Sequence, residues 1–535
     1  MKNRYKDVLN LMKNNAKAVS VTSILVIFNA LLTFSIPVCI SLLLERISNQ
    51  NFKWFILIFV GLSLAIITLK YILAICKKRY STHFRTELNL DLFNQLFKVK
   101  YSVLNQKGIM YYLETINIAV NNINNLLMNM LPHLISTILM LTVSVLIIIH
   151  YSWAVALYLI VLVFLEWFVY KKINEALSKK SVNLQQVCGR GFGYIMSLLD
   201  NLDFLKSRSK YQGILTLLRP KVHDIHATNE DVNAFAGNVS NLFITFVEFS
   251  QYFLYLVFAY QTLNSGNNFS QYVFLMIILN LFFNNLSLVS SISLKYSDAV
   301  ASWQFIENEI MHEQEKTGDL ELEEINKVEF KNSKVAYDDN LLLDNVDIEL
   351  NKGDIIFIKG ETGSGKSSLF KSLLNFVEPS NLYINGTQYG DYKLEDIKDK
   401  ICYLSQNSAL FDDSLENNIL IGDNLDSSKL FKSKFLSKFL DGNKLKNLLI
   451  QNKGGNLSGG DKQKILLARY LLRDYDLVIL DEITSSMDSE TETVVFSQLL
   501  QNKDDIKVII SHNDNLMRYA NKVYQVKDKS LVKIK

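Results

Sequence analysis

A glycine-rich turn at residues 360–367 has the residue types that bind the phosphates of a nucleotide. The surrounding stretch, DIIFIKGETGSGKSSLFKSLL, predicts a strand before the turn and a helix after it, and its spacing fits G-x-x-x-x-G-K-[ST]. Glycines let backbone N–H groups curl around a phosphate, and the start of the helix adds a positive dipole. We expect Lys366 to neutralise the outer phosphates and Ser367 to ligate Mg²⁺. The candidate phosphate-binding residues are Gly360, Glu361, Thr362, Gly363, Ser364, Gly365, Lys366, Ser367 and Ser368.

A second candidate for chemistry is the pair of carboxylates that ends the apolar run LVILDE, residues 477–482. Four apolar residues predict a buried strand of a parallel sheet, whose carboxyl end is where nucleotides bind in such folds. Asp481 can hold Mg²⁺, and Glu482 can polarise an attacking water. An acidic strand end by itself is more often only solvated, but next to a phosphate loop it predicts a catalytic role.

A third stretch, LSGGDKQKILLARYLL, repeats the features of a phosphate site. Ser458 offers a hydroxyl, Gly459 and Gly460 expose backbone N–H groups, and a predicted helix begins directly behind them. One domain does not need two such sites for one triphosphate. Two domains that face each other would use both, one site from each domain for each triphosphate.

The first half of the chain predicts the elements of a membrane domain. Each of its apolar runs is long enough, at 1.5 Å per residue, to cross a hydrocarbon core of about 30 Å. The runs lie near 18–44, 54–76, 126–149, 152–170, 239–264 and 269–294. The first run is too long for a cleavable signal peptide. Beyond the runs, FRTELNLDLFNQLFKV has apolar residues at three- and four-residue spacing, which predicts that the helices extend into the cytoplasm.

The distribution of Lys and Arg predicts the orientation of these spans. Basic residues are concentrated before the first run, after the second at 77–79 and after the fourth at 171–180, whereas the connections 150–152 and 264–271 have none. The basic segments should face the cytoplasm. We therefore expect an integral membrane protein of a bacterial cytoplasmic membrane, with both termini and the second half on the cytoplasmic side.

Composition and charge divide the chain into two parts and exclude some classes of protein. The 535 residues are 49% hydrophobic, with only four prolines, which favours long helices. Residues 1–305 are predicted to be the transmembrane domain, the acidic segment 306–326 a linker, and 327–535 an α/β phosphate-loop ATPase domain with a helical subdomain. A net charge of +3 predicts no nucleic-acid partner, and four scattered cysteines predict neither zinc nor disulfides.

Taken together, these motifs resemble the ATP-binding cassette (ABC) exporters over almost the whole chain. In that family, the signature LSGGQ of one cassette closes over ATP held by the phosphate loop of the other. Residues 457–460 match the signature, while Asp461 stands where the family has glutamine. The resemblance implies further roles: adenine stacking for Tyr337, a Mg²⁺-sensing glutamine at Gln406, a dimer contact at Asp488 and a switch histidine at His512.

The resemblance also implies how the protein works. Segments 101–123 and 198–211 are similar to the coupling-helix regions of exporters. Only one cassette is present, so the resemblance implies a dimer with a second half-transporter. The intact hydrolytic positions of this copy favour a homodimer, and a different partner with degenerate positions is the alternative. ATP with Mg²⁺ would then drive alternating access in the lipid bilayer, with Lys366, Glu482 and His512 as the catalytic residues.

The cargo is predicted from polar residues in the spans. Asn280, Asn284, Ser287 and Ser291 recur at helical spacing, which predicts a stripe facing a water-filled cavity or another helix. Glu248 and Glu166 are intramembrane carboxylates that could attract a cationic cargo. Glu166 is interpreted as near enough to the interface to be merely solvated, so Glu248 is the preferred candidate.

We therefore expect an exporter of a peptide or an amphipathic small molecule, without a leader-cleaving extension at its amino terminus. A lipid flippase is a close alternative. An ATP-gated channel or peptide sensor would share every feature of the sequence, and only flux against a gradient separates it from a pump.

Overall fold

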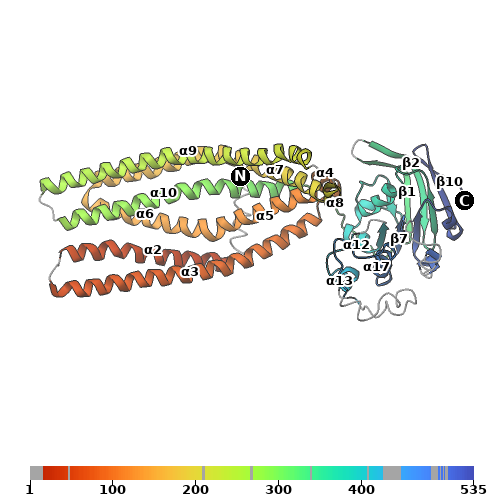
Figure 1. Cartoon of the computed structure of the whole chain (residues 1–535), viewed down its shortest axis with the longest axis horizontal. Helices are drawn as coiled ribbons and strands as arrows, with labels where there is room; N and C mark the ends of the chain where they lie inside the picture. The colour runs from red at the N-terminus through yellow and green to blue at the C-terminus, as the bar shows by residue number, and fades with distance from the viewer. Residues whose placement is uncertain are drawn as a thin grey trace. The chain divides into compact units, whose positions relative to one another are not determined.

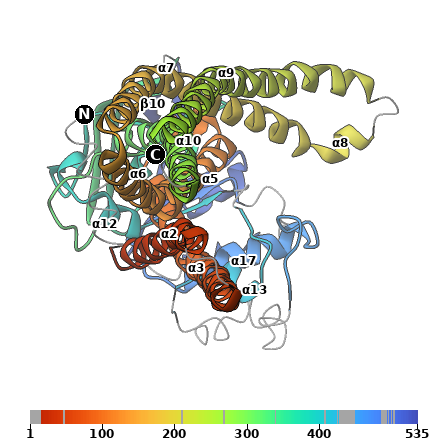
Figure 2. The ribbon, with the colours of Figure 1, turned by 90° about the vertical axis from the view of Figure 1, so that its left-hand side faces the viewer.

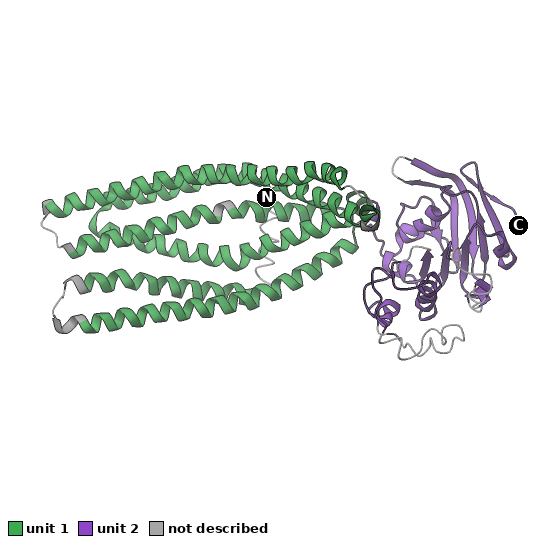
Figure 3. Ribbon diagram, viewed as in Figure 1, with its two compact units in different colours: residues 1–99, 103–314 green, residues 100–102, 315–535 purple. Residues whose placement is uncertain are grey.

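The computed structural model describes residues 16–45, 49–207, 211–265, 269–337, 340–405, 409–423, 425, 448–483, 492–493, 496–497, 499–500 and 504–535. It divides into two compact units, residues 1–99 with 103–314 and residues 100–102 with 315–535, coloured separately in Figure 3. The boundary between Gln314 and Glu315 lies inside the predicted linker.

Long helices make up unit 1 (Figure 1). In chain order they are α2 (Ala16–Glu45), α3 (Asn49–Phe97), α4 (Tyr101–Lys107), α5 (Ile109–Asn125), the π-helix η1 (Leu126–Met130), α6 (Leu131–Tyr151), α7 (Trp153–Leu199), α8 (Leu202–Lys206), α9 (Gln212–Ser265), α10 (Phe269–Phe305) and the π-helix η2 (Ile306–Met311). Six of the helical stretches in the described residues are long and apolar enough to cross a membrane, as the sequence predicts.

The two larger apolar cores among the described residues hold this bundle together. The predicted helical extension of the second span forms, because Phe84, Leu88, Leu92, Leu96 and Val99 are all buried in one core with α5 and η2. The other core joins α6, α7, α9 and α10. Figure 2 looks along the bundle and shows α2 and α3 side by side, in agreement with their contacts.

A row of polar side chains follows the seam between α7 and α10, inside the bundle. Glu166 accepts from Ser290 at 2.6 Å, Ser181 donates to Asp298 at 2.8 Å, and the amide of Gln185 donates to the hydroxyl of Ser302 at 2.9 Å. Buried polar groups need partners, and each of these bonds provides one from the facing helix. The seam therefore has a fixed register along two long helices that could otherwise slide.

Two sheets form the frame of unit 2. Its elements are β1 (Lys327–Tyr337), β2 (Asn340–Asn351), β3 (Ile355–Lys359), α11 (Lys366–Lys371), η3 (Ser372–Leu374), β4 (Leu382–Ile384), β5 (Thr387–Gln388), η4 (Tyr389–Asp391), α12 (Leu394–Asp399), β6 (Ile401–Ser405), α13 (Leu415–Leu420), α17 (Gly459–Leu471), β7 (Leu477–Asp481), β8 (Ile506–Ile510), η5 (Asp514–Tyr519), β9 (Lys522–Lys527) and β10 (Ser530–Lys533).

The larger sheet has the order β10-β9-β3-β8-β7-β6, and its strands from β9 to β6 run parallel. The second sheet, β2-β1-β4-β5, is antiparallel. A separate apolar cluster holds α13 against α17, which matches the predicted helical subdomain. Unit 2 thus has the predicted α/β architecture.

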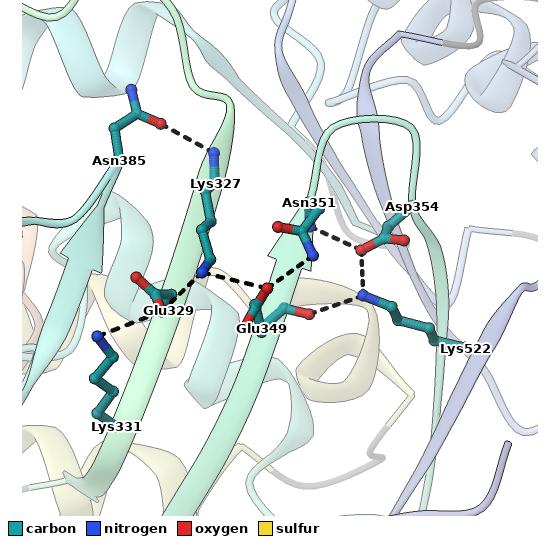
Figure 4. A network of polar contacts seen from close by, with 8 residues as sticks. All are labelled: Lys327, Glu329, Lys331, Glu349, Asn351, Asp354, Asn385 and Lys522. Carbon is teal, nitrogen blue, oxygen red and sulfur yellow. Dashed lines mark hydrogen bonds and ion pairs between the residues drawn. The ribbon is translucent and has the colours of Figure 1, made fainter.

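Figure 4 shows a network of polar contacts that runs from β1 and β2 of the smaller sheet to Lys522 of β9 in the larger one. Asp354, between β2 and β3, accepts from the backbone N–H of Asn351 at 2.7 Å and from the ammonium of Lys522 at the start of β9. Lys327 of β1 pairs with Glu329 at 3.0 Å and with Glu349 of β2 at 3.3 Å. Asp354 is only 9% exposed, so its contacts carry more stability than the outer pairs.

Candidate nucleotide site

The loop between β3 and α11 has the conformation that its glycines predict. Gly363 and Gly365 have φ of 81° and 93°, in the left-handed region that favours glycine. A Cβ at Gly365 would also lie 3.1 Å from a side-chain carbon of Leu343. The hydroxyl of Ser364 is buried in the same loop and has no hydrogen bond in the described part of the chain. The loop therefore has an unused donor where the sequence predicts a phosphate.

Lys366 folds back over this loop. Its ammonium donates to the carbonyl oxygens of Gly360 at 2.8 Å and Glu361 at 2.7 Å. Burial lowers the pKa of Lys366, while the carboxylates of Glu482 and Asp481 act in the opposite direction. An ammonium group whose hydrogen bonds among the described residues go to neutral carbonyls is suited to exchange them for the charged oxygens of a phosphate.

Ser367 and Asp481 meet at the start of α11, with 2.8 Å between the hydroxyl and the carboxylate oxygen Oδ1. The second carboxylate oxygen accepts from the phenol of Tyr403 at 2.5 Å. Burial, and then the contact with Asp481, raises the pKa of Tyr403, which therefore stays a donor. A hydroxyl and a carboxylate side by side are oxygen ligands of the kind that Mg²⁺ prefers, so the two residues fit that ion.

Tyr403 is a residue of the site that the sequence analysis missed. It lies inside β6, opposite Ile479 of β7 in the parallel register, and the strand pattern alone gives no reason to assign it a polar partner. Its role is to orient the carboxylate of Asp481. Only the pairing of β6 with β7 brings the two side chains together.

Glu482 follows the end of β7 with a φ of 53°, which is uncommon for a residue with a side chain. Its backbone N–H donates to the carbonyl of Ile510 in β8 at 3.0 Å, and its carboxylate lies 3.2 Å from Nε2 of His512. The same imidazole nitrogen is 3.3 Å from the hydroxyl of Thr362 in the glycine-rich loop. The two predicted catalytic side chains therefore meet beside the loop.

The strand register explains why these residues converge. In the parallel sheet, Ile510 of β8 lies opposite both Ile358 of β3 and Asp481 of β7, and Asp481 lies opposite Ser405 of β6. The carboxyl ends of four strands therefore meet at one edge, which is where doubly wound folds bind their ligands.

The signature-like loop caps α17. The hydroxyl of Ser458 accepts from the backbone N–H of Asp461 at 3.2 Å and lies 2.7 Å from the carboxylate of the same residue. Lys464 pairs with the other carboxylate oxygen at 3.1 Å. Burial works against ionisation of Asp461, but hydrogen bonds from Ser458 and Lys464 lower its pKa. Asp461 is therefore an anion beside the two predicted phosphate-facing glycines, Gly459 and Gly460.

Three residues implied by the resemblance stay predictions. The backbone of Tyr337 ends β1, but its side chain lies outside what the structure describes. Gln406 and Asp488 both lie outside the described residues. The adenine contact, the Mg²⁺-sensing loop and the dimer contact therefore rest on the sequence alone.

Within unit 1, three of the predicted cargo residues are exposed and Glu166 is buried. Asn280 and Asn284 are exposed, and the amide of Asn284 lies 3.3 Å from the side-chain oxygen of Asn280, which Gln251 of α9 also approaches at 3.3 Å. Glu248 is exposed as well. The interpretation of Glu166 as solvated is wrong, because α7 points it into the bundle and leaves it 1% exposed.

Comparison with known proteins identifies the domain that contains these residues. Residues 343–485 match the family described as ABC transporter. The chain carries an ABC transporter domain. This domain binds ATP in the matched family, and here it follows six candidate membrane spans in the same chain.

The similar proteins place the ABC transporter domain in an exporter fold. A solved structure described as a bacterial Atm1-family ABC exporter with ATP bound superposes with a TM-score of 0.84, at 17% identity, over 97% of this chain and 94% of that one. An "ATP-dependent lipid A-core flippase" of Photorhabdus laumondii is 31% identical over 46% of this chain and 44% of its own length. A "Probable ABC transporter ATP-binding/permease protein" of Haemophilus influenzae is 28% identical over 39% of each. The aligned region spans less than half of these curated relatives.

Proposed function

We propose that this chain is one half of an ATP-driven exporter, and that two copies form the working unit in a bacterial cytoplasmic membrane. The observation that carries the proposal is the convergence of Lys366, Ser367, Asp481, Glu482 and His512 at one sheet edge. The same chain carries six candidate spans. With the positive-inside distribution of charge, both termini and the ABC domain are cytoplasmic.

The second copy supplies the other half of each ATP site. In the described part of the chain, the hydrogen bonds of the Ser458 side chain stay within its own loop. This loop is free to face a nucleotide held by the glycine-rich loop of a partner. A homodimer then has two equivalent sites, each made from both chains.

The residues of this edge divide the work of hydrolysis. Backbone N–H groups of the loop and Lys366 bind and orient the phosphates. Ser367 and Asp481 would hold Mg²⁺, which would neutralise charge on the phosphates. Glu482 polarises the attacking water, and His512 keeps the carboxylate in position while it contacts the terminal phosphate.

Closure of two ABC domains over ATP shifts the population of the membrane helices from inward-open to outward-open conformations. A mostly open population becomes mostly closed only if ATP favours the closed dimer by about 5 kcal/mol. Two triphosphates buried between the domains are a sufficient source. Hydrolysis at Glu482 removes this preference and resets the helices.

The cargo we propose is a peptide or an amphipathic small molecule. The exposed pair Asn280 and Asn284, joined to Gln251, offers amide groups that bind peptide-like polar groups. Glu248 is exposed at a span and would attract cationic cargo. A lipid is the second candidate, which the name "ATP-dependent lipid A-core flippase" of the Photorhabdus relative favours.

Nucleotide binding tests the first step of this proposal. Lys366→Ala removes the ammonium group that the phosphates would engage, so we expect ATP affinity to fall at least about tenfold. Lys359→Ala is the matched control. Lys359 ends β3, directly before the glycine-rich loop, but its ammonium group pairs with Asp514 at 2.7 Å. Equal ATP affinity of Lys366→Ala and the wild type would remove the glycine-rich loop from nucleotide binding.

A further inference from the structure

The buried face of α7 contains a carboxyl group at membrane depth. Leu159, Leu162, Glu166, Tyr170 and Leu177 recur at helical spacing and are all buried. Glu166 lies about 20 Å along the helix from Trp153, well inside a hydrocarbon core of about 30 Å. An acidic side chain at this depth is costly, so its presence calls for a function.

Only one of the two oxygens of this carboxyl group has a hydrogen bond among the described residues. Its oxygen Oε1 accepts from Ser290 of α10 at 2.6 Å. The other oxygen, Oε2, is buried without a hydrogen bond in the described part of the chain. One turn further along α7, the phenol oxygen of Tyr170 is also buried without a bond of ordinary length, although the hydroxyls of Ser240 and Ser290 lie close enough to interact with it.

The cations on the same helix do not neutralise Glu166. The ammonium groups of Lys171 and Lys172 lie over the rings of Trp167 and Phe168, 5.1 and 4.9 Å from their centroids, on the exposed side of α7. No ion pair of Glu166 occurs among the described residues. A cation with hydrogen-bond donors would therefore satisfy the unused oxygen and stabilise the ionised form of the carboxyl group.

An apolar pocket of about 350 Å³ opens between α7 and α9, and Glu166 is not among the residues that line it. Its lining residues are Leu165, Val169, Val239, Leu242, Phe243 and Phe246. Tyr170 connects the pocket to the carboxyl group, because its ring packs edge-on against Phe243 with 5.7 Å between centroids. The pocket offers apolar contact, and the acidic group lies one turn of α7 from the tyrosine behind its wall, a combination that suits an amphiphilic cation.

We propose that Glu166, Ser290 and Tyr170 form a site for the ammonium group of a lipophilic amine, whose apolar part lies in the pocket between α7 and α9. A primary ammonium has three donors, which can engage Oε2 of Glu166 and the phenol oxygen of Tyr170. A divalent metal fits less well, since the described residues contain no group of three or more acidic, His or Cys side chains that could hold one. That the amine is a transported cargo rests on the function proposed above, whereas its binding does not.

Binding to the purified full chain in lipid nanodiscs, without nucleotide, tests the site. The probe is dansylcadaverine, a fluorescent primary amine, and the ligand control is its N-acetylated derivative, which is neutral. We expect the wild type to prefer the amine by about tenfold or more, and Glu166→Gln to abolish this preference. Glu175→Gln, at an exposed carboxyl group of the same helix, should leave it unchanged.

Tyr170→Phe provides a second test that keeps the packing of the helices. It should weaken binding of the amine severalfold and leave binding of the acetylated probe unchanged. Equal binding of both probes to the wild type would show that the pocket takes apolar chains only, and would overturn the proposal. An unchanged preference for the amine in Glu166→Gln would overturn it too. Because no ATP is present, these results are independent of whether the chain hydrolyses ATP.

Discussion

At the scale of single residues, Asp461 is the feature that separates this chain from the signature it resembles. Its carboxylate lies 2.7 Å from the Ser458 hydroxyl, and Lys464 balances part of its charge at 3.1 Å. A phosphate approaching this loop would meet a negative charge, and Ser458 would have to give up its contact with Asp461. Asp461 should therefore slow closure over ATP.

Replacing Asp461 tests this effect. Asp461→Gln removes the charge and frees Ser458, so the apparent KM for ATP in the ATPase assay should fall about two- to tenfold. Because the pKa of Asp461 is lowered, the carboxylate is ionised throughout neutral pH, and the ratio between variant and wild type should stay constant from about pH 6 to 8. Asp461→Glu keeps the charge and serves as the control. A higher KM in Asp461→Gln would show that Asp461 assists closure.

Residue-scale prediction from sequence succeeds where a motif is local. The glycine-rich loop spans few residues, so spacing alone locates Lys366 and Ser367 beside the carboxyl end of a strand. Tyr403 and Glu166 could not be assigned in this way, because their surroundings come from β7 and α10, far away in the chain. The position of Glu166 along its span does not reveal whether a neighbouring helix covers that face of α7.

At the scale of elements, Asp354 connects the turn after β2 to β9. Asp354→Ala leaves the N–H of Asn351 and the ammonium of Lys522 without this partner, so the free energy of unfolding of unit 2 should fall by about 1–3 kcal/mol. Differential scanning calorimetry of the full chain should show its transition a few degrees lower.

The matched control for this change is Lys331→Ala. Lys331 pairs with Glu329 at 3.3 Å on the surface, and its own side chain is 57% exposed. Such a pair contributes less than about 1 kcal/mol, so the transition should hardly move. Equal shifts for the two variants would show that Asp354 is no more important than a surface charge.

The long helices were predictable as spans because apolar runs and helical spacing extend along each of them. The polar seam between α7 and α10 could not be predicted. Ser181 and Gln185 have the spacing of an ordinary solvated helix face, and nothing in the pattern pairs them with Asp298 and Ser302 of α10. Which helices face each other is decided by packing of the whole bundle, and a single helix pattern does not contain that information.

At the scale of the whole molecule, six candidate spans and an ABC transporter domain lie in one chain. In the proposed dimer, each ATP site is made from both chains. The fold of each unit follows from patterns of period 3.6 and 2 in the sequence. The cargo does not, because the same exporter fold carries proteins with different cargoes, and function has to be argued from the site.

The most direct test of this account is the ATPase rate of the purified chain in lipid, wild type against Glu482→Gln, together with the amount of ATP that remains bound. Glu482→Gln keeps the loop, Lys366 and Asp481, so it should bind about one ATP per chain as a dimer while hydrolysis falls about 10²- to 10⁴-fold. Glu378→Gln, at an exposed carboxyl group of the same unit, should hydrolyse ATP like the wild type. Wild-type hydrolysis by Glu482→Gln, or binding of ATP by single chains without dimerisation, would contradict the account.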